Sequence, residues 1–330
     1  MDNHFIYLLC AALAPIVAGL GYIFCKDKYN KEPVSVLAGS FFLGIFSIIP
    51  IGIIEETIEA FIQIDSLLPN PLLYAFCNAF VVAACTEECF KMYFLHNYIW
   101  KKPEFDERFD GIVYGVFVSL GFACAENLQY VMGFYSVGGA IVAYTVSIRR
   151  AIFTIPCHFF CGVILGYYLS LAKFERNKKN TKSSYISMGL LYAILFHGIF
   201  DFILFYQTAY YYNLNLGNEK EIAAQPIAPA LVLFIIFIIF NFVFWKFGRK
   251  RIKRLADLLR PKSKDEIPVY ITCSNCGTSY SSEQNACPKC NQLAEKSLQD
   301  QKDALNQNLH NINEFLSNQD ASSPKKPFDM

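Results

Sequence analysis

The apolar stretch VVAACTEECFKMYF, residues 81–94, contains three ionisable side chains: Glu87, Glu88 and Lys91. At 100° per residue on an α-helix, all three lie within an arc of about 100° and face one place. An ion pair that ties helices together is one interpretation, because Glu and Lys four residues apart stabilise a helix. One lysine can neutralise only one of two glutamates, however, and ionisable groups inside a membrane are functional by default. The stretch is therefore a candidate site.

Three later apolar stretches also contain ionisable residues. They carry Glu126 with Asn127 (GFACAENLQY), His158 (IPCHFFCGV), and His197 with Asp201 (FHGIFDF). His158 alone is typical of a packed core histidine. His197 and Asp201 are one helical turn apart, and a carboxylate beside an imidazole can fix its tautomer and raise its basicity. Together these side chains suit water activation, metal ligation or a proton path.

The elements that position these residues are predicted membrane spans. The chain has 330 residues, of which 54% are hydrophobic and 17% charged, and its net charge of +1 suggests neither a nucleic-acid binder nor an acidic chaperone. We predict an all-α multi-pass membrane protein with about seven transmembrane helices. The stretch 135–148 is short and glycine-rich, which suggests an interfacial or re-entrant piece. The seven apolar blocks run roughly over 5–25, 33–54, 71–99, 111–133, 151–172, 185–206 and 228–247.

Basic residues predict the orientation. Lys and Arg concentrate in the connections 26–32, 100–110 and 173–184 and after the last block, whereas 55–70 has none and 207–227 has only Lys220. Arg149 and Arg150 are the exception on the basic-poor side. By the positive-inside rule, the N-terminus lies outside the cell membrane and the C-terminus in the cytoplasm. The first block is expected to be an anchor, because no positive region precedes it.

Three motifs carry a family resemblance. EECFK (residues 87–91) matches E-E-x-x-K, FACAE (122–126) matches F-x-x-x-E, and HGIFD (197–201) matches H-x-x-x-D. In this order, each within its own span, they resemble the PrsW family of intramembrane proteases, which is related to the type II CAAX prenyl endopeptidases. The segment around His158 also resembles that family's next span. The resemblance covers roughly residues 1–247.

The resemblance implies hydrolysis of peptide bonds in membrane-anchored protein substrates. Characterised relatives make the first cut in a membrane-tethered anti-sigma factor, so a regulatory protein is the expected substrate. Carried over by motif, the catalytic candidates are Glu87, Glu88, Glu126, His158, His197 and Asp201, with Lys91 and Asn127 in support.

Two chemical schemes stay open. A desolvated glutamate could act as general base while a histidine polarises the carbonyl. Alternatively His158, His197 and Glu126 could hold a catalytic Zn²⁺ with another glutamate as base, the scheme we slightly favour, although H-E-x-x-H is absent. Glu87 lies in the inner half of its span and Glu126 and His158 in the outer halves of theirs. Tilted or broken helices could bring these residues to one level.

The polar tail contains C-x₂-C, ten residues, and C-x₂-C. This pattern resembles a short zinc ribbon, because paired thiolates suit tetrahedral Zn²⁺ and so small a fold needs a metal. Two disulfides are the alternative, which a cytoplasmic location disfavours. We expect the ribbon to bind a cytoplasmic protein partner rather than nucleic acid. Its four cysteines are Cys273, Cys276, Cys287 and Cys290.

The predicted domains are a membrane protease domain (1–247), a basic juxtamembrane linker (248–265), a zinc ribbon (266–295) and a polar, partly disordered tail (296–330). The linker is expected to face anionic lipid headgroups. Two other functions compete with the protease. One is a proton- or metal-coupled transporter, although the chain lacks paired halves with broken helices. The other is a catalytically dead membrane scaffold.

Overall fold

A computed structural model describes residues 3–27, 31–175, 182–215, 228–258, 270–273, 275–281, 287 and 289–290. The chain divides into two compact units, Met1–Arg260 and Pro261–Met330. The predicted boundaries within the tail fall largely outside the described residues.

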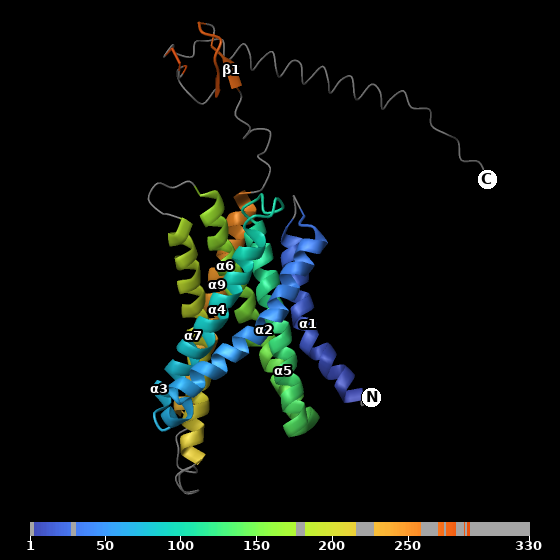
Figure 1. The fold of residues 1–330 in the computed structure, drawn as a ribbon, viewed down its shortest axis with the longest axis vertical. Coiled ribbons are helices and arrows are strands. Elements are labelled where there is room, and N and C mark those ends of the chain that lie inside the picture. The colour runs from blue at the N-terminus through green and yellow to red at the C-terminus, as the bar shows by residue number, and fades with distance from the viewer. Residues whose placement is uncertain are drawn as a thin grey trace, which may run out of the picture. The chain divides into compact units, whose positions relative to one another are not determined.

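The first unit is a helical bundle (Figure 1). A 3₁₀ turn, η1, follows the second helix, and two π-helical stretches, η2 and η3, interrupt later ones. In chain order the elements are α1 (Asn3–Lys26), α2 (Val34–Ile62), η1 (Ile64–Leu67), α3 (Pro71–Phe76), η2 (Cys77–Ala84), α4 (Cys85–Ile99), α5 (Asp110–Arg149), η3 (Arg150–Thr154), α6 (Ile155–Phe174), α7 (Lys182–Asn215) and α9 (Ala228–Leu258).

Five helical segments are long and apolar enough to cross a membrane. One of them, Asp110–Phe174, has 65 residues and would be about 100 Å long as a straight helix, three times the hydrocarbon thickness. It folds back on itself and accounts for two passes, and α9 brings the helices to seven. The prediction of an all-α multi-pass membrane protein with about seven spans is confirmed.

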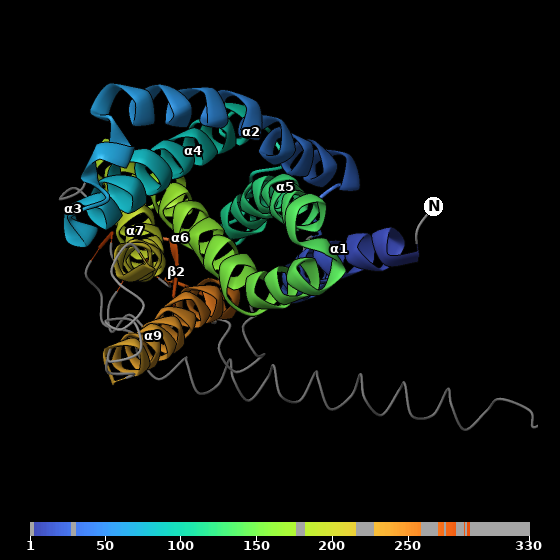
Figure 2. The same ribbon diagram turned by 90° about the horizontal axis from the view of Figure 1, so that it is seen from below.

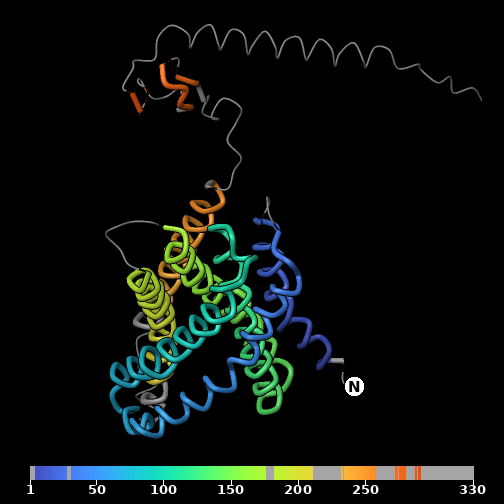
Figure 3. The backbone as a smooth tube through the Cα atoms, turned by 45° about the horizontal axis from the view of Figure 1, so that its top comes forward, coloured from blue at the N-terminus to red at the C-terminus, as the bar shows by residue number. Residues whose placement is uncertain are grey.

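The reversal inside this segment lies at Gly139, whose backbone φ of 71° and ψ of −171° suit glycine alone. Val131 and Ala143, on either side of it, pack in one apolar cluster. The two arms are visible in green in Figure 3. The stretch 135–148 is therefore helical on both sides of a glycine turn.

Helix α2 also differs from its prediction, because it continues to Ile62 instead of ending near residue 54. The extra residues, EETIEAFI, include no glycine or proline that would break a helix. The helix ends where Gln63 takes a left-handed conformation and its N–H bonds the carbonyls of Ala60 and Glu59. Glu55 is consequently a helical residue.

Helix α6 is the centre of the bundle. Sixteen of its 20 residues are buried, and Figure 2 shows it between the other helices. Its contact with α5 is backbone to backbone, because a Cβ on Gly115 would clash with the Gly162 carbonyl and one on Gly166 with the Gly111 carbonyl. Such small-xxx-small pairs let membrane helices approach closely. This close packing fixes α6 against the arm that carries Glu126.

The described part of the second unit contains one antiparallel hairpin. Strands β1 (Tyr270–Thr272) and β2 (Ser279–Ser281) pair with Ile271 opposite Tyr280. The turn between them contains Gly277 at a φ of 67°. The hairpin brings Cys273 and Cys276 together at its turn.

Candidate active site

Glu87, Glu88 and Lys91 lie on the first two turns of α4 and point into the bundle. Their side chains are almost completely buried, with 6%, 0% and 0% of their surfaces exposed. The Lys91 ammonium donates to Glu87 Oε2 at 2.9 Å and to Glu88 Oε1 at 2.8 Å, and it lies 4.3 Å from the Phe122 ring centroid. Helical periodicity therefore predicted correctly that these three side chains share one face of α4.

Two histidines turn their Nδ1 atoms toward this group. His158 on α6 has Nδ1 3.2 Å from Lys91 Nζ and 4.0 Å from Glu87 Oε2. His197 on α7 has Nδ1 2.8 Å from Glu88 Oε1 and 3.9 Å from Glu87 Oε2. The two rings meet edge to face, with their centroids 5.1 Å apart. His158, which alone suggested a packed core residue, belongs to the same cluster.

A carboxylate holds each histidine on its other nitrogen. His158 Nε2 lies 2.9 Å from Glu126 Oε2, and His197 Nε2 lies 3.2 Å from Asp201 Oδ2. When Nε2–H donates to that carboxylate, Nδ1 keeps its lone pair and faces the two glutamates. The Nδ1 of a neutral His197 then faces the Glu88 carboxylate lone pair to lone pair. That contact is repulsive unless His197 is protonated or a cation lies nearby, and the Lys91 ammonium already binds the same Glu88 oxygen at 2.8 Å.

Arg150 is a member of the site that sequence reasoning missed. Its guanidinium, 8% exposed, contacts Glu126 Oε2 at 2.7 Å and donates from Nε to Asn127 Oδ1 at 2.7 Å. Asn127 in turn donates to the Ala12 carbonyl at 2.8 Å. The signal that could have found Arg150 was its position on the basic-poor side, where it departs from the positive-inside pattern. A buried arginine there needs a buried partner.

Glu55, near the end of α2, also faces the cluster. It interacts electrostatically with Glu87, Glu126 and Lys91, and its Oε1 is buried with no hydrogen-bond partner. Sequence reasoning placed this residue in a connection outside the bilayer. Its position on the core-facing side became visible only once α2 was known to extend beyond it.

The helices bring these side chains to one level despite their different depths in the predicted spans. Each π-helical stretch directly precedes a helix that carries site residues. Stretch η2 ends at Ala84, just before α4, and η3 (Arg150–Thr154) lies just before α6. A π-helical turn changes the register of the helix that follows, and such turns often occur at functional sites. The expected mismatch between Glu87 and the pair Glu126 and His158 is therefore absent.

The donor set fits a metal ion. One ligand atom from each of four buried side chains lies within 4.8 Å of the other three: Glu87, Glu88, His158 and His197. The hydrogen-bonded cluster contains four carboxylates and two permanent cations, so with neutral histidines its formal charge is −2, which one divalent ion would balance. Lys91 touches the same oxygens and would share them with a metal. Glu126 is outside the group of four, because Arg150 and His158 engage its carboxylate.

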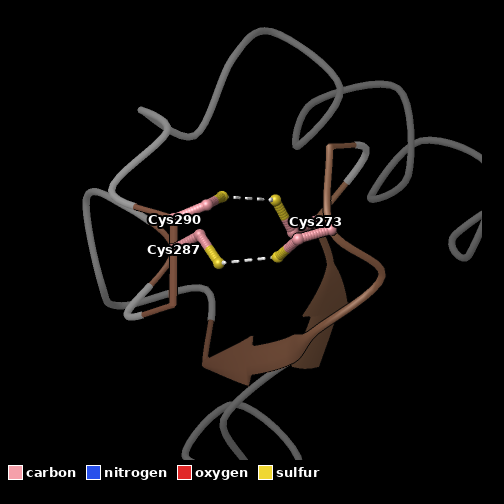
Figure 4. A group of neighbouring side chains, drawn as sticks. Cys273, Cys287 and Cys290 are labelled. Atoms are coloured by element: carbon pink, nitrogen blue, oxygen red, sulfur yellow. Dashed lines mark hydrogen bonds between the residues drawn. The ribbon is translucent and has the colours of Figure 1, made fainter.

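The second candidate metal centre lies in the tail (Figure 4). The sulfur atoms of Cys273 and Cys290 are 3.5 Å apart, as are those of Cys276 and Cys287. The four sulfurs lie within 4.8 Å of one another. Tetrahedral Zn–S bonds of about 2.3 Å imply sulfur separations of nearly 4 Å. The four thiols thus have the arrangement of a metal-binding ribbon and not of two disulfides.

Comparison with known proteins agrees with this geometry. Residues 32–242, more than half of the chain, match the PrsW family intramembrane metalloprotease. A protein named Protease PrsW from Clostridioides difficile (strain 630) is 38% identical over 197 residues, which are 60% of this chain and 79% of that protein. The Bacillus subtilis (strain 168) Protease PrsW is 36% identical over 197 residues, which are 60% of this chain and 82% of that protein.

A third relative, Protease PrsW of Geobacillus kaustophilus (strain HTA426), is 32% identical over 209 residues, which are 63% of this chain and 84% of that protein. No solved structure matches the chain. The expected resemblance is confirmed, and with it the membrane location and the peptidase class. This chain belongs to the PrsW family of intramembrane metalloproteases.

Proposed function

We propose that this protein hydrolyses peptide bonds of membrane-tethered protein substrates at the cluster on α4, α5, α6 and α7. Regulatory proteins of the anti-sigma-factor kind are the substrate class that the family resemblance suggests. One observation carries the proposal: two buried imidazoles, each bound at Nε2 by a carboxylate, present Nδ1 to a pair of glutamates. Carboxylate-bound histidines of this kind are typical metal ligands.

In our proposal, Glu88, His158 and His197 hold one Zn²⁺, because catalytic zinc sites commonly use three protein ligands. The ion supplies Lewis-acid polarisation of the scissile carbonyl and a more acidic water. Glu87, the more exposed of the paired glutamates at 6% against 0%, is the general base. It takes a proton from the attacking water and gives it to the leaving amine as the C–N bond breaks.

The remaining polar residues orient this set. Glu126 and Asp201 hold the imidazoles, and Arg150 and Asn127 hold Glu126 in place. Lys91 supplies positive charge between the two glutamates, which would otherwise repel each other in a low dielectric. Glu126, first considered as a zinc ligand, therefore becomes a positioning residue in this scheme.

The proposed orientation keeps the N-terminus outside the cell membrane and the C-terminus in the cytoplasm. Contacts between the basic connections support it. Lys173 donates to the carbonyls of Trp100 and Phe105, and Lys182 lies 3.6 Å from the Trp100 ring centroid. The basic end of α9 reaches the same region, where Arg254 donates to the Tyr167 hydroxyl. These basic segments thus share one end of the bundle, as the positive-inside rule requires.

The tail has a separate proposed role. Cys273, Cys276, Cys287 and Cys290 bind one structural Zn²⁺, and the ribbon recruits or senses a cytoplasmic protein partner. The basic residues between 246 and 254 extend α9 beyond its apolar part, which suits contact with anionic lipid headgroups. No nucleic-acid partner is proposed.

The function is tested by comparing membrane proteomes of cells that express wild type, Glu88→Gln or Glu56→Gln. Glu56 is exposed on α2, so its substitution is the matched control. We expect a shortened single-span protein in cells with wild type and Glu56→Gln only, at equal enzyme abundance. Glu87→Gln should behave as Glu88→Gln does, with cleavage reduced at least about 100-fold. Cleavage that persists in the Glu87→Gln, Glu88→Gln double variant would contradict the proposed mechanism.

Metal analysis tests the ligand assignment independently of activity. Wild type should contain two zinc ions per chain, and a Cys273→Ser, Cys276→Ser variant should retain one. Adding His197→Ala to that variant should remove the last ion. One ion per wild-type chain, lost completely with the cysteines, would instead favour the glutamate-only scheme.

A further inference from the structure

An apolar groove lies on the outside of the bundle between α1 and α9, with α6 and η3 beneath it. Its volume is about 790 Å³, within the range of about 300–1,000 Å³ that is typical of small-ligand sites. Tyr22 on α1 and Trp245 on α9 line it and are exposed, so the groove opens outward. His158, which is buried on α6, is not part of its lining. We call this space the α1–α9 groove, and it is separate from the proposed active site.

The floor of the groove explains why the space exists. Two adjacent residues of α6, Phe159 and Phe160, each hold one of the flanking helices. The Phe159 ring meets Tyr22 of α1 with the centroids 5.9 Å apart, and the Phe160 ring meets Phe244 of α9 at 5.8 Å. Adjacent residues of a helix point about 100° apart. Helices α1 and α9 therefore pack on neighbouring faces of α6, and the space between them stays open.

The two flanking helices line the groove with the same arrangement of side chains. On each helix an aromatic residue precedes a cation by one turn: Tyr22 precedes Lys26, and Trp245 precedes Arg249. Lys26 Nζ lies 5.5 Å from the Tyr22 ring centroid, and Arg249 Cζ lies 4.4 Å from that of Trp245. Aromatic and basic side chains of this kind are typical of a membrane interface. Both helices run in the same direction through the bundle (Figure 3), so the two cations lie at the same end of the groove.

The length of the groove matches one leaflet of a bilayer. Its lining extends from Pro15 to Lys26 on α1 and from Ile238 to Arg249 on α9. Each stretch advances 11 residues, about 16 Å of helix, and half of the hydrocarbon layer is about 15 Å thick. A transmembrane helix of a substrate would need an apolar groove about twice as long. An acyl chain ends at the middle of the bilayer, so the length favours a lipid.

The charges at the end of the groove are unneutralised in the part of the chain that the structure describes. Neither Lys26 nor Arg249 is in an ion pair within 4.0 Å there, and no described lining residue is acidic. Asn241, farther along the groove, donates to the Phe237 carbonyl of its own helix at 2.8 Å. An ammonium and a guanidinium beside an apolar groove are complementary to a lipid phosphate, which the guanidinium can bind with two hydrogen bonds.

We propose that the α1–α9 groove binds one anionic phospholipid, with an acyl chain over Phe159 and Phe160 and its phosphate between Lys26 and Arg249. In the proposed orientation this lipid belongs to the cytoplasmic leaflet, where anionic lipids attract basic segments. The site is more specific than headgroup contact along the end of α9, because it holds one molecule and takes a cation from α1. The bound lipid fills the gap between α1 and α9 and thereby stabilises the beginning of α6, which carries His158.

The test measures thermal unfolding of the delipidated full-length protein in a neutral detergent. Phosphatidylglycerol, phosphatidylcholine with the same acyl chains, and water-soluble glycerol phosphate are titrated separately at constant ionic strength. We expect phosphatidylglycerol to raise Tm saturably by about 3 °C or more, at a concentration at least about tenfold below that needed for phosphatidylcholine. Glycerol phosphate should have no effect, because it has no acyl chain. Native mass spectrometry should show one phosphatidylglycerol retained per chain.

A pair of double variants tests the role of the two cations. Lys26→Gln with Arg249→Gln should remove the preference for phosphatidylglycerol over phosphatidylcholine. Lys250→Gln with Lys253→Gln is the matched control, because it removes the same charge from exposed positions of α9 outside the groove. Lys26 and Arg249 are themselves exposed, so their substitution should leave the fold intact.

A second pair of variants tests the apolar part. Ala18→Trp places a large side chain in the groove and should weaken binding of both lipids, whereas Val17→Trp, on the neighbouring exposed face of α1, should not. No saturable Tm rise in wild type, equal effects of the two lipids, a rise with glycerol phosphate, or a preference that survives the double cation variant overturns the proposal. Displacement of the lipid by a single-span apolar peptide also overturns it and assigns the groove to a substrate helix. The wild-type titrations decide the matter even if Ala18→Trp fails to fold.

Discussion

The two candidate metal centres of this chain are built in opposite ways. The tail centre takes four thiols from 18 consecutive positions, and the buried apolar cluster of the described tail consists only of those cysteines. The membrane centre takes its side chains from three helices between Glu87 and His197, inside a bundle whose large apolar core is independent of them. We therefore expect the tail to fold only when its metal is bound. The bundle, in contrast, should fold without a metal and thereby position the ligands of its own site.

The largest expected effect of this difference is on metal removal. A chelator should unfold the tail, because structural zinc binding contributes about 10–16 kcal/mol to so small a fold. The bundle should keep its helices and its detergent-resistant core. Limited proteolysis of the full chain, with and without chelator, reports unfolding of the tail. Circular dichroism reports whether the bundle keeps its helices. A tail that stays protease-resistant after its metal is gone would break the comparison.

A smaller loss of stability is expected when one partner of a buried ion pair inside the bundle is removed. Arg150→Leu leaves Glu126 and Asn127 without their partner and should destabilise the protein by about 3–5 kcal/mol, the usual cost of a broken buried pair. Arg149→Leu is the matched control, because Arg149 is exposed. The measurement is unfolding in mixed micelles, and equal stability of the two variants would show that Arg150 is not buried as described.

The smallest expected effect concerns a residue that positions its neighbour. Asp201→Asn keeps a hydrogen-bond acceptor for His197 Nε2 but removes the charge, so kcat/KM should fall about 10–100-fold. His197→Ala removes the proposed ligand itself and should cost at least about 100-fold. Both rates are read from cleavage of one tethered substrate and corrected for enzyme abundance. An aspartate effect as large as the histidine effect would assign Asp201 a direct chemical role.

Helical periodicity and motif spacing carried much of this description without any structure. EECFK places two glutamates and a lysine on one face, HGIFD places a histidine and an aspartate one turn apart, and both arrangements appear in the bundle. The paired C-x₂-C motifs likewise predicted the tail centre. These features are local, because 3.6 residues per turn, or a tight turn between two cysteines, relates only near neighbours.

Tertiary structure alone decided which distant groups meet. The reversal at Gly139 brings Arg150 onto Glu126, 24 residues away, and the extended α2 turns Glu55 toward the site. Glu32, just before α2, likewise accepts a hydrogen bond from the Tyr114 hydroxyl on α5, 82 residues away. Such contacts depend on where helices end, bend and cross. Local periodicity carries no information about the distance between two helices, whereas packing of glycine faces and pairing of buried charges determine it.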